Sequence, residues 1–230
     1  MQQSAGRAPL GRPREPPGHL AGLGAVELDA RGDRERHERE QFCGLRHGPI
    51  LTERDTGRQD ERVTDERIEP PLTGGERETL RAYLDWHRAT LALKCEGLSD
   101  DDLRRRSMPP STLSLLGLVR HMAEVERSWF RRVIDGQDVP LVWSPDGDFQ
   151  VAYDATGADR AEAFAAWEAE IAHGRRIERA APSLDTTGVD RRYGTVYSLR
   201  LVLLHLIQEY ARHNGHADLL RECIDGRIGV

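Results

Sequence analysis

From about residue 73 onward, apolar residues recur every three to four positions, which is the period of an amphipathic α-helix. Four stretches of this kind are bounded by residues that commonly begin or end helices. The first opens on the capping-box pattern Thr73-Gly-Gly-Glu76 and ends at Gly97. The other three are expected to begin at Ser111 or Ser114, at the segment Thr156-Gly-Ala-Asp159 and at Ser198, and to end at Gly136, before Pro182 and at Gly226.

No pair of segments alternates convincingly between apolar and polar residues, so the sequence offers no clear β-strands. Four long amphipathic helices favour an all-α four-helix bundle. The loops after the second and third helices are long, and long loops often cover a site or make a crossover. We therefore expect the first of them, which carries Trp143 and Asp146, to cover a functional site.

Residues 1–70 lack this periodicity and are crowded with Arg, Gly, Pro, Asp and Glu. Such a composition buries too little apolar surface to offset the entropy of ordering. We interpret this part as a disordered extension or a gene start placed too far upstream, and residues 71–230 as the folded domain. Cys43 and His47 resemble half of a zinc site, but no second half follows them.

The overall charge narrows the classes of partner. A net charge of −6 provides no basic field for nucleic acid, and no apolar run approaches the length of a transmembrane helix. Three widely spaced cysteines without a CxxC motif make a disulfide framework improbable. We therefore expect a cytoplasmic protein that binds neither nucleic acid nor membranes.

The fourth predicted helix carries the clearest chemical pattern. His205, Glu209 and His213 are spaced four apart and so lie along one helix face, which also carries apolar residues. Residues four apart lie about 6 Å apart along the axis, and residues eight apart about 12 Å. Two neighbours in the row can therefore share one ion, whereas a third ligand must come from another helix.

His121, at the edge of the apolar stripe of the second helix, is the best third ligand, and His87 on the first helix is a weaker one. Gly117 lies one turn before His121 and would leave room for an ion or a ligand. The predicted metal ligands are thus His121, Glu209 and His213. Two imidazoles and a carboxylate leave a fourth position open, as in catalytic zinc sites, although nickel, iron and manganese also accept such ligands.

Simpler interpretations exist for each of these residues. A single histidine on an apolar stripe is often a hydrogen-bonded core residue, and Glu209 with His213 could be a surface pair. His205 suits a supporting role beside the ligands, or a place in the core, better than ligation. His216 could pair with Asp218 or be solvated.

Three stretches together resemble the DinB-like superfamily, most closely an actinobacterial branch of it. They are Leu84-Asp-Trp-His-Arg88, the segment from Leu115 to Glu126, and the segment from Glu209 to Glu222. The resemblance implies a four-helix bundle of the DinB/YfiT type with one metal-binding His on the second helix and two metal-binding residues four apart on the last. The mycothiol-dependent maleylpyruvate isomerases are similar in using His, Glu and His, which correspond here to His121, Glu209 and His213.

This resemblance implies a metal-dependent S-transferase or isomerase that uses a low-molecular-weight thiol such as mycothiol and an electrophilic substrate. The isomerases carry a second domain after the bundle, for which the sequence up to Val230 has no counterpart, so thiol transfer is the leading hypothesis. Arg212, Tyr210 and Asn214 are further candidates for contacts with the metal ligands or the substrate. The competing hypothesis is a non-catalytic bundle with a structural metal that forms a homodimer or serves in a stress response.

Overall fold

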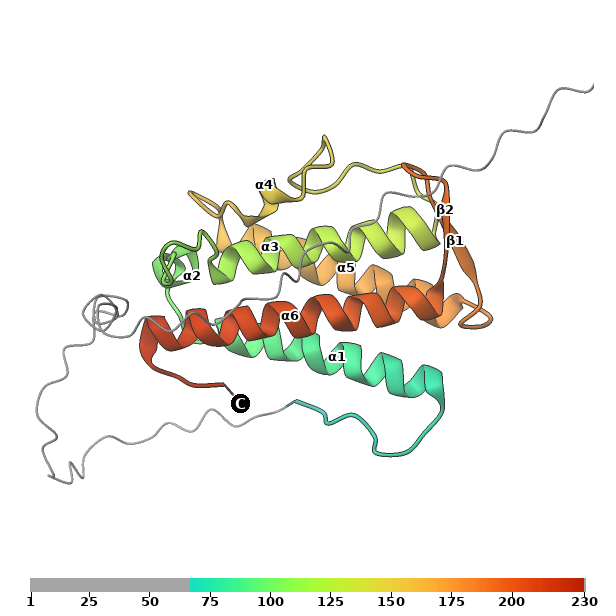
Figure 1. Ribbon diagram of the computed structural model, residues 1–230, viewed down its shortest axis with the longest axis horizontal. Coiled ribbons are helices and arrows are strands. Elements are labelled where there is room, and N and C mark those ends of the chain that lie inside the picture. The colour runs from blue at the N-terminus through green and yellow to red at the C-terminus, as the bar shows by residue number, and fades with distance from the viewer. Residues whose placement is uncertain (1–66, 230) are drawn as a thin grey trace, which may run out of the picture. The chain divides into compact units, whose positions relative to one another are not determined.

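Four long helices form the part of the protein that the computed structural model describes, residues 67–229. They are α1 (Glu76–Cys95), α3 (Leu115–Glu126) with its continuation as the π-helix η2 (Arg127–Ile134), α5 (Arg160–Ala180) and α6 (Leu199–Asp225). The helices lie side by side, with α1 packed mainly on α6 and α3 mainly on α5, while α3 also contacts α6 (Figure 1).

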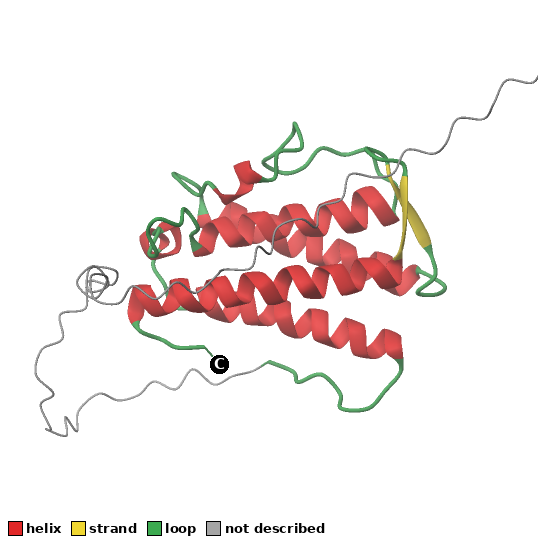
Figure 2. Cartoon of the chain, in the orientation of Figure 1, coloured by secondary structure: helices red, strands yellow, loops and turns green. Residues whose placement is uncertain are grey.

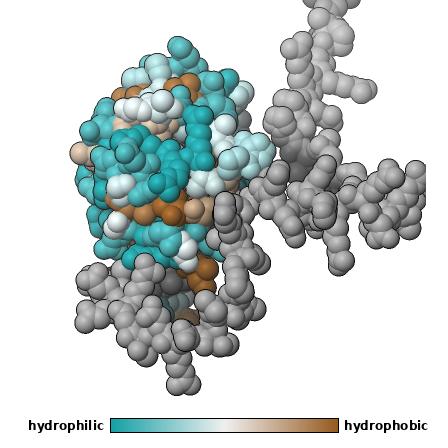
Figure 3. Space-filling view, turned by 90° about the vertical axis from the view of Figure 1, so that its left-hand side faces the viewer, coloured by the Kyte–Doolittle hydropathy of each residue, from teal (hydrophilic) through white to brown (hydrophobic). Residues whose placement is uncertain are grey.

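The prediction of an all-α, DinB-like fold is confirmed. The predicted extension, with Cys43 and His47, falls almost entirely on residues 1–66, which lie outside the described part of the chain. Among residues 67–229, no helix is both long and apolar enough to cross a membrane. Seen from the end that carries α2, hydrophilic residues predominate on the surface and apolar residues form separate patches (Figure 3).

Side chains begin three of the long helices as the sequence predicts. The N-cap residues of these helices are Ser114, Asp159 and Ser198. In each, the side-chain oxygen accepts a hydrogen bond from the backbone N–H group of the residue three positions later. Gly226 ends α6 in the left-handed conformation. The capping box predicted at Thr73 is wrong, because the N-cap of α1 is Gly75, which has no side chain to accept a bond. The capping pattern lies two residues too early in the sequence.

The polar loop before α6 contains a short β-hairpin, which corrects the expectation that no strands are present (Figure 2). Strands β1 (Thr187–Asp190) and β2 (Thr195–Ser198) are antiparallel, and Gly188 pairs with Tyr197. Four residues a strand are too few for a period of two to emerge from the sequence. The smaller helices are α2 (Asp100–Arg104) and α4 (Gln150–Tyr153).

A buried polar network joins the four long helices inside the apolar core. The Arg88 guanidinium on α1 donates two 2.8 Å hydrogen bonds to the Glu126 carboxylate of α3. The Tyr210 hydroxyl of α6 donates to the same carboxylate at 2.8 Å and accepts from the indole N–H of Trp167 on α5 at 2.8 Å. Tyr210 is fully buried in this network, so it is not the substrate-contacting group that the sequence suggested.

Candidate metal centre

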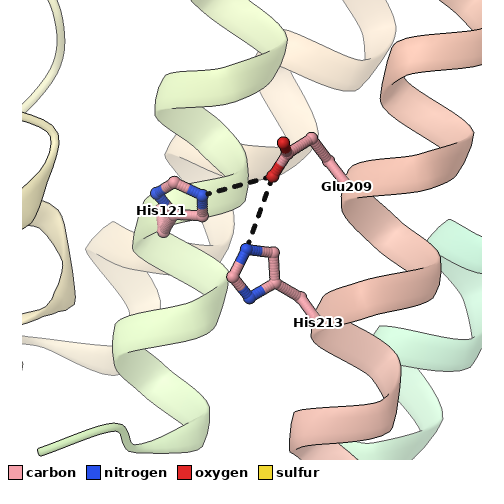
Figure 4. Close-up of side chains that lie close together, drawn as sticks. All are labelled: His121, Glu209 and His213. Atoms are coloured by element: carbon pink, nitrogen blue, oxygen red, sulfur yellow. Dashed lines mark ion pairs between the residues drawn. The ribbon is translucent and has the colours of Figure 1, made fainter. Parts of the chain in front are cut away.

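The three predicted ligands lie together between α3 and α6 (Figure 4). Glu209 and His213 occupy successive turns of α6 on the side that faces α3, and His121 points toward them from α3. The Oε2 atom of Glu209 lies 3.5 Å from His213 Nε2 and 3.9 Å from His121 Nε2. One candidate donor atom from each residue lies within 4.8 Å of the others. Both histidines are buried and the glutamate is half-buried.

These distances can be compared with a zinc site. Zinc–nitrogen and zinc–oxygen bonds of about 2.0–2.1 Å at tetrahedral angles place ligand atoms about 3.4 Å apart. The two separations that involve Glu209, 3.5 and 3.9 Å, are close to this value. Both ring nitrogens of His121 are buried without a hydrogen-bond partner among residues 67–229, an arrangement that folded proteins rarely tolerate. The cluster is therefore compatible with a divalent metal ion that would satisfy this imidazole.

The electrostatics of the cluster favour the protonation states that metal binding requires. The facing imidazoles of His121 and His213 hold the pKa of Glu209 well below its usual range. Burial is the main reason why the pKa of His121 is lowered, and the charge of a protonated His213 would lower it further. At neutral pH the site thus presents a carboxylate and a neutral His121 imidazole, as ligands must be deprotonated to coordinate.

Tyr153, which the sequence analysis did not single out, closes one side of the cluster. Its ring is stacked on His121 with centroids 4.3 Å apart, and its hydroxyl lies 3.3 Å from His213 Nε2. Burial, together with the negative charge of Glu209, raises the pKa of Tyr153 to about 12. The hydroxyl therefore stays protonated at neutral pH and is available as a hydrogen-bond donor beside the candidate ligands.

Gly117 has a different role from the one that the sequence suggested. A Cβ at this position would collide with the carbonyl oxygen of Tyr153, so the glycine makes room for the backbone of α4 rather than for an ion. Arg120 holds the same segment by donating a 3.1 Å hydrogen bond to the Ala152 carbonyl. Close packing of α4 on α3 thus places Tyr153 over His121. A glycine on the buried face of the helix was the only signal of this contact in the sequence.

The loop before α4 lies against the cluster, as expected, but through Phe149 at its end and not through Trp143. The buried Glu124 carboxylate accepts 2.8 Å hydrogen bonds from the backbone N–H groups of Val142 and Trp143, and Arg120 lies over the Trp143 ring. Phe149, at the end of this loop, instead makes an edge-on contact with His121 at a centroid distance of 6.5 Å. The cover of the cluster is therefore Phe149 and Tyr153.

Two further histidines on α6 contact the cluster. His205 Nε2 lies 3.6 Å from Glu209 Oε1, the carboxylate oxygen that points away from His213, which agrees with a supporting role. The Nδ1 atoms of His216 and His213 lie 3.3 Å apart. The expected pairing of His216 with Asp218 is wrong, since Asp218 binds Lys94 at 2.7 Å. Residues three apart on a helix are neighbours, so the spacing of His213 and His216 allows this contact. Whether His216 turns toward His213 or toward Asp218 depends on which face of the helix is buried.

The remaining candidates lie outside the cluster. Asn214 donates a 3.0 Å hydrogen bond to the backbone carbonyl of His87, so these two residues contact each other rather than the candidate ligands. Arg212 is exposed on α6 and makes no hydrogen bond or ion pair within residues 67–229. Of the three candidates Arg212, Tyr210 and Asn214, Arg212 is therefore the one whose side chain is exposed and makes no hydrogen bond or ion pair among the described residues.

The fold and the cluster together define the class of protein. Four long helices with a His, Glu and His group between α3 and α6 form a DinB-like helical protein with a site compatible with a divalent metal. A model of the mycothiol-S-transferase family matches residues 79–226, and the chain belongs to this family. A comparison with curated proteins gave no match.

Proposed function

We propose that the protein is a metal-dependent thiol S-transferase whose divalent ion is held by His121, Glu209 and His213. The observation that supports this most directly is the buried His121 imidazole, which faces a carboxylate and a second imidazole. Its two ring nitrogens have no hydrogen-bond partner in the part of the chain that the structure describes. Two nitrogen ligands and one oxygen ligand suit zinc, and nickel accepts the same set. Membership of the mycothiol-S-transferase family supports mycothiol as the thiol.

A divalent ion at this position would lower the pKa of a thiol and so supply thiolate at neutral pH. In the overall transfer, the thiol loses its proton to solvent and its sulfur forms a bond to the electrophilic carbon of the acceptor. The bond to the leaving group breaks, and the leaving group departs with that electron pair. The balanced products are a thioether, the leaving group with its electron pair and one proton in solvent.

The residues around the cluster position these reactants. The lone pair of His213 Nε2 is directed into the cluster when Nδ1 carries the proton and donates it to His216 Nδ1, 3.3 Å away. The protonated Tyr153 hydroxyl can donate a hydrogen bond to a group bound beside the cluster. Phe149 and Tyr153 exclude water from this side, which strengthens the electrostatic interactions within it.

Metal analysis of the full-length chain tests the site. We expect close to one equivalent of metal in the purified protein and a loss of nearly all of it in His121→Ala. The matched control is His87→Ala, which removes a histidine outside the cluster and should retain the metal. Equal metal content in all three proteins, or none in the wild type after growth with zinc and nickel, would contradict the proposal.

Thiol consumption tests the reaction. We expect the metal-loaded protein to accelerate the loss of mycothiol in the presence of an activated aryl halide, and His121→Ala to reduce the rate to background. A protein that retains its metal but gives no acceleration with a panel of thiols and electrophiles would favour the competing structural role for the metal.

A further inference from the structure

A second site lies beside the candidate metal centre, at the hairpin end of the helices. It is a cavity of about 400 Å³ lined by η2, by the loop that precedes α4 and by the tip of the β-hairpin. This volume falls within the range of small-molecule sites, about 300–1,000 Å³. None of the three candidate ligands lines it, so the cavity is separate from the cluster.

The wall of the cavity is built by close contacts between the hairpin and η2. A Cβ at Gly188 on β1 would collide with the backbone carbonyl of Val133, so only glycine lets the strand approach the helix this closely. Arg191, at the hairpin tip, donates a hydrogen bond to the Gly136 carbonyl and lies 3.6 Å from the Asp138 carboxylate. These contacts fix the rim before any ligand is bound.

The side chains that line the cavity carry equal numbers of positive and negative charges. Three arginines and three aspartates face the cavity: Arg132, Arg191, Arg192, Asp138, Asp146 and Asp190. Arg191 and Asp190 are used within the protein, the latter as an acceptor for the Arg192 N–H at 2.8 Å. By contrast, neither Arg132 nor Asp146 has a polar partner anywhere in residues 67–229. One donor group and one acceptor group are thus available to a ligand.

This balance points to the class of ligand. An anionic ligand would favour a lining with net positive charge, whereas here equal numbers of arginine and aspartate cancel. Hydroxyl groups both donate and accept, so a polyhydroxylated, uncharged molecule can use an arginine and an aspartate together. The rings of Phe149 and Tyr193 supply apolar faces of the kind on which sugar rings pack.

The cavity lies within reach of the cluster. Ser128, in its lining, follows His121 by seven residues, which is two helical turns, or about 10 Å along the same face. Phe149 lines the cavity and also contacts His121 edge-on. A thiol whose sulfur lies at the cluster can therefore extend into the cavity with its non-reacting part.

We infer that this cavity binds the polyhydroxylated, non-reacting part of the thiol substrate, with Arg132 and Asp146 as its hydrogen-bonding partners. The inference rests on the proposed function, because it assigns the cavity to the substrate of the same site. Mycothiol meets the requirement, since its cysteine is carried on a neutral sugar–inositol unit. Binding energy from this remote part would position the sulfur.

Calorimetric titration of the full-length, metal-loaded chain with mycothiol and with N-acetylcysteine tests the inference. We expect Arg132→Ala to weaken mycothiol binding roughly tenfold or more, the loss typical of one hydrogen bond to a charged group. N-acetylcysteine, which lacks the sugar unit, should bind Arg132→Ala and wild type equally. Arg179→Ala, an exposed arginine on α5 outside the cavity, is the matched control and should not change either affinity. Asp146→Ala, in an exposed loop, should reproduce the effect of Arg132→Ala if the latter folds poorly.

A thiol-free probe separates this inference from the proposed function. The N-acetylglucosaminyl-inositol unit, whose nitrogen is an uncharged amide, should give saturation-transfer signals with both wild type and His121→Ala, and weaker signals with Arg132→Ala and Asp146→Ala. Binding of this probe without any binding of mycothiol would support the cavity and contradict the thiol transferase. Unchanged mycothiol affinity in both cavity variants, or no signal from the probe with wild type, would overturn the inference.

Discussion

Replacing Glu126 by glutamine is the sharpest test of how the four helices are held together. The Glu126 carboxylate is fully buried and accepts hydrogen bonds from Arg88 and Tyr210, all at 2.8 Å. Glutamine preserves the shape of the side chain but removes its negative charge and turns one acceptor into a donor. The buried Arg88 guanidinium, 4% exposed, then lacks a full counter-charge in the core.

The expected loss is large compared with the total. Breaking a buried ion pair by removing one partner costs about 3–5 kcal/mol, because an uncompensated charge stays in a low-dielectric environment. Domains of this size unfold with about 5–15 kcal/mol. At about 2–4 °C for each kcal/mol, Glu126→Gln should lower Tm by about 6–20 °C. Asp85, which binds Arg88 at 2.8 Å from its partly exposed position, moderates the loss toward the lower figure.

Urea denaturation of the full-length chain, followed by circular dichroism at 222 nm, measures this loss. The double variant Arg88→Met with Glu126→Gln removes both charges, and it should be more stable than Glu126→Gln alone. Tyr210→Phe removes one hydrogen bond to the Glu126 carboxylate and one from the Trp167 indole but leaves the Arg88–Glu126 ion pair in place, so it should cost less than Glu126→Gln. A loss below about 1 kcal/mol in Glu126→Gln would refute the reasoning, because it would show that the network contributes no more than an exposed pair.

Three further outcomes are expected. Gly117→Ala should lower the free energy of unfolding by about 1–3 kcal/mol through overpacking against α4, and urea denaturation equal to wild type would contradict the contact with Tyr153. Tyr153→Phe should leave metal content unchanged and lower kcat for thiol transfer roughly tenfold, whereas an unchanged kcat would exclude a role for the hydroxyl. The metal-free chain should lose stability as pH falls below the ordinary histidine value of 6.5, because burial lowers the pKa of His121 and of His173 in the folded state, so the unfolded state takes up protons first. A Tm that stays flat between pH 7 and pH 5 would contradict this.

The sequence predicted correctly most of the features that depend on a single helix, such as which residues share a face and where three of the long helices begin. The spacing of Glu209 and His213 placed both on one face of the last helix. The apolar stripe around His121 placed this residue on the inward-facing side of a second helix. The structure brings these three residues into one cluster, and their role as metal ligands remains our proposal. Helix caps such as Ser114 and Ser198 were also predictable, because their signals lie within four residues.

Contacts between elements could not be predicted in this way. Tyr153 belongs to a helix of four residues, too short for a period of 3.6 to appear in the sequence, and its position over His121 depends on how closely α4 packs on α3. Tyr210 follows Glu209 directly and was grouped with it, although successive helical residues point about 100° apart. Only the packing of α6 against α1 and α3 decides which of the two enters the core.

The direct succession of Glu209 and Tyr210 also connects helix packing with the candidate metal centre. Tyr210 is hydrogen-bonded to Glu126, which follows His121 by five residues on the same helix, about 7.5 Å along the axis. A slide of α6 by one residue, about 1.5 Å, would break this bond and separate Glu209 from His121 at once. The network therefore sets the register in which the candidate ligands meet.

Glu126→Gln should accordingly weaken metal binding as well as lower stability. The matched comparison is Leu91→Ala, which removes a fully buried side chain of α1 at a similar cost of about 2–5 kcal/mol but leaves the network intact. Under conditions where both variants are folded, competition with a chelator should show a lower metal affinity in Glu126→Gln than in Leu91→Ala. Equal affinities would mean that the candidate ligands hold their positions through the apolar packing of α3 and α6, independently of the network.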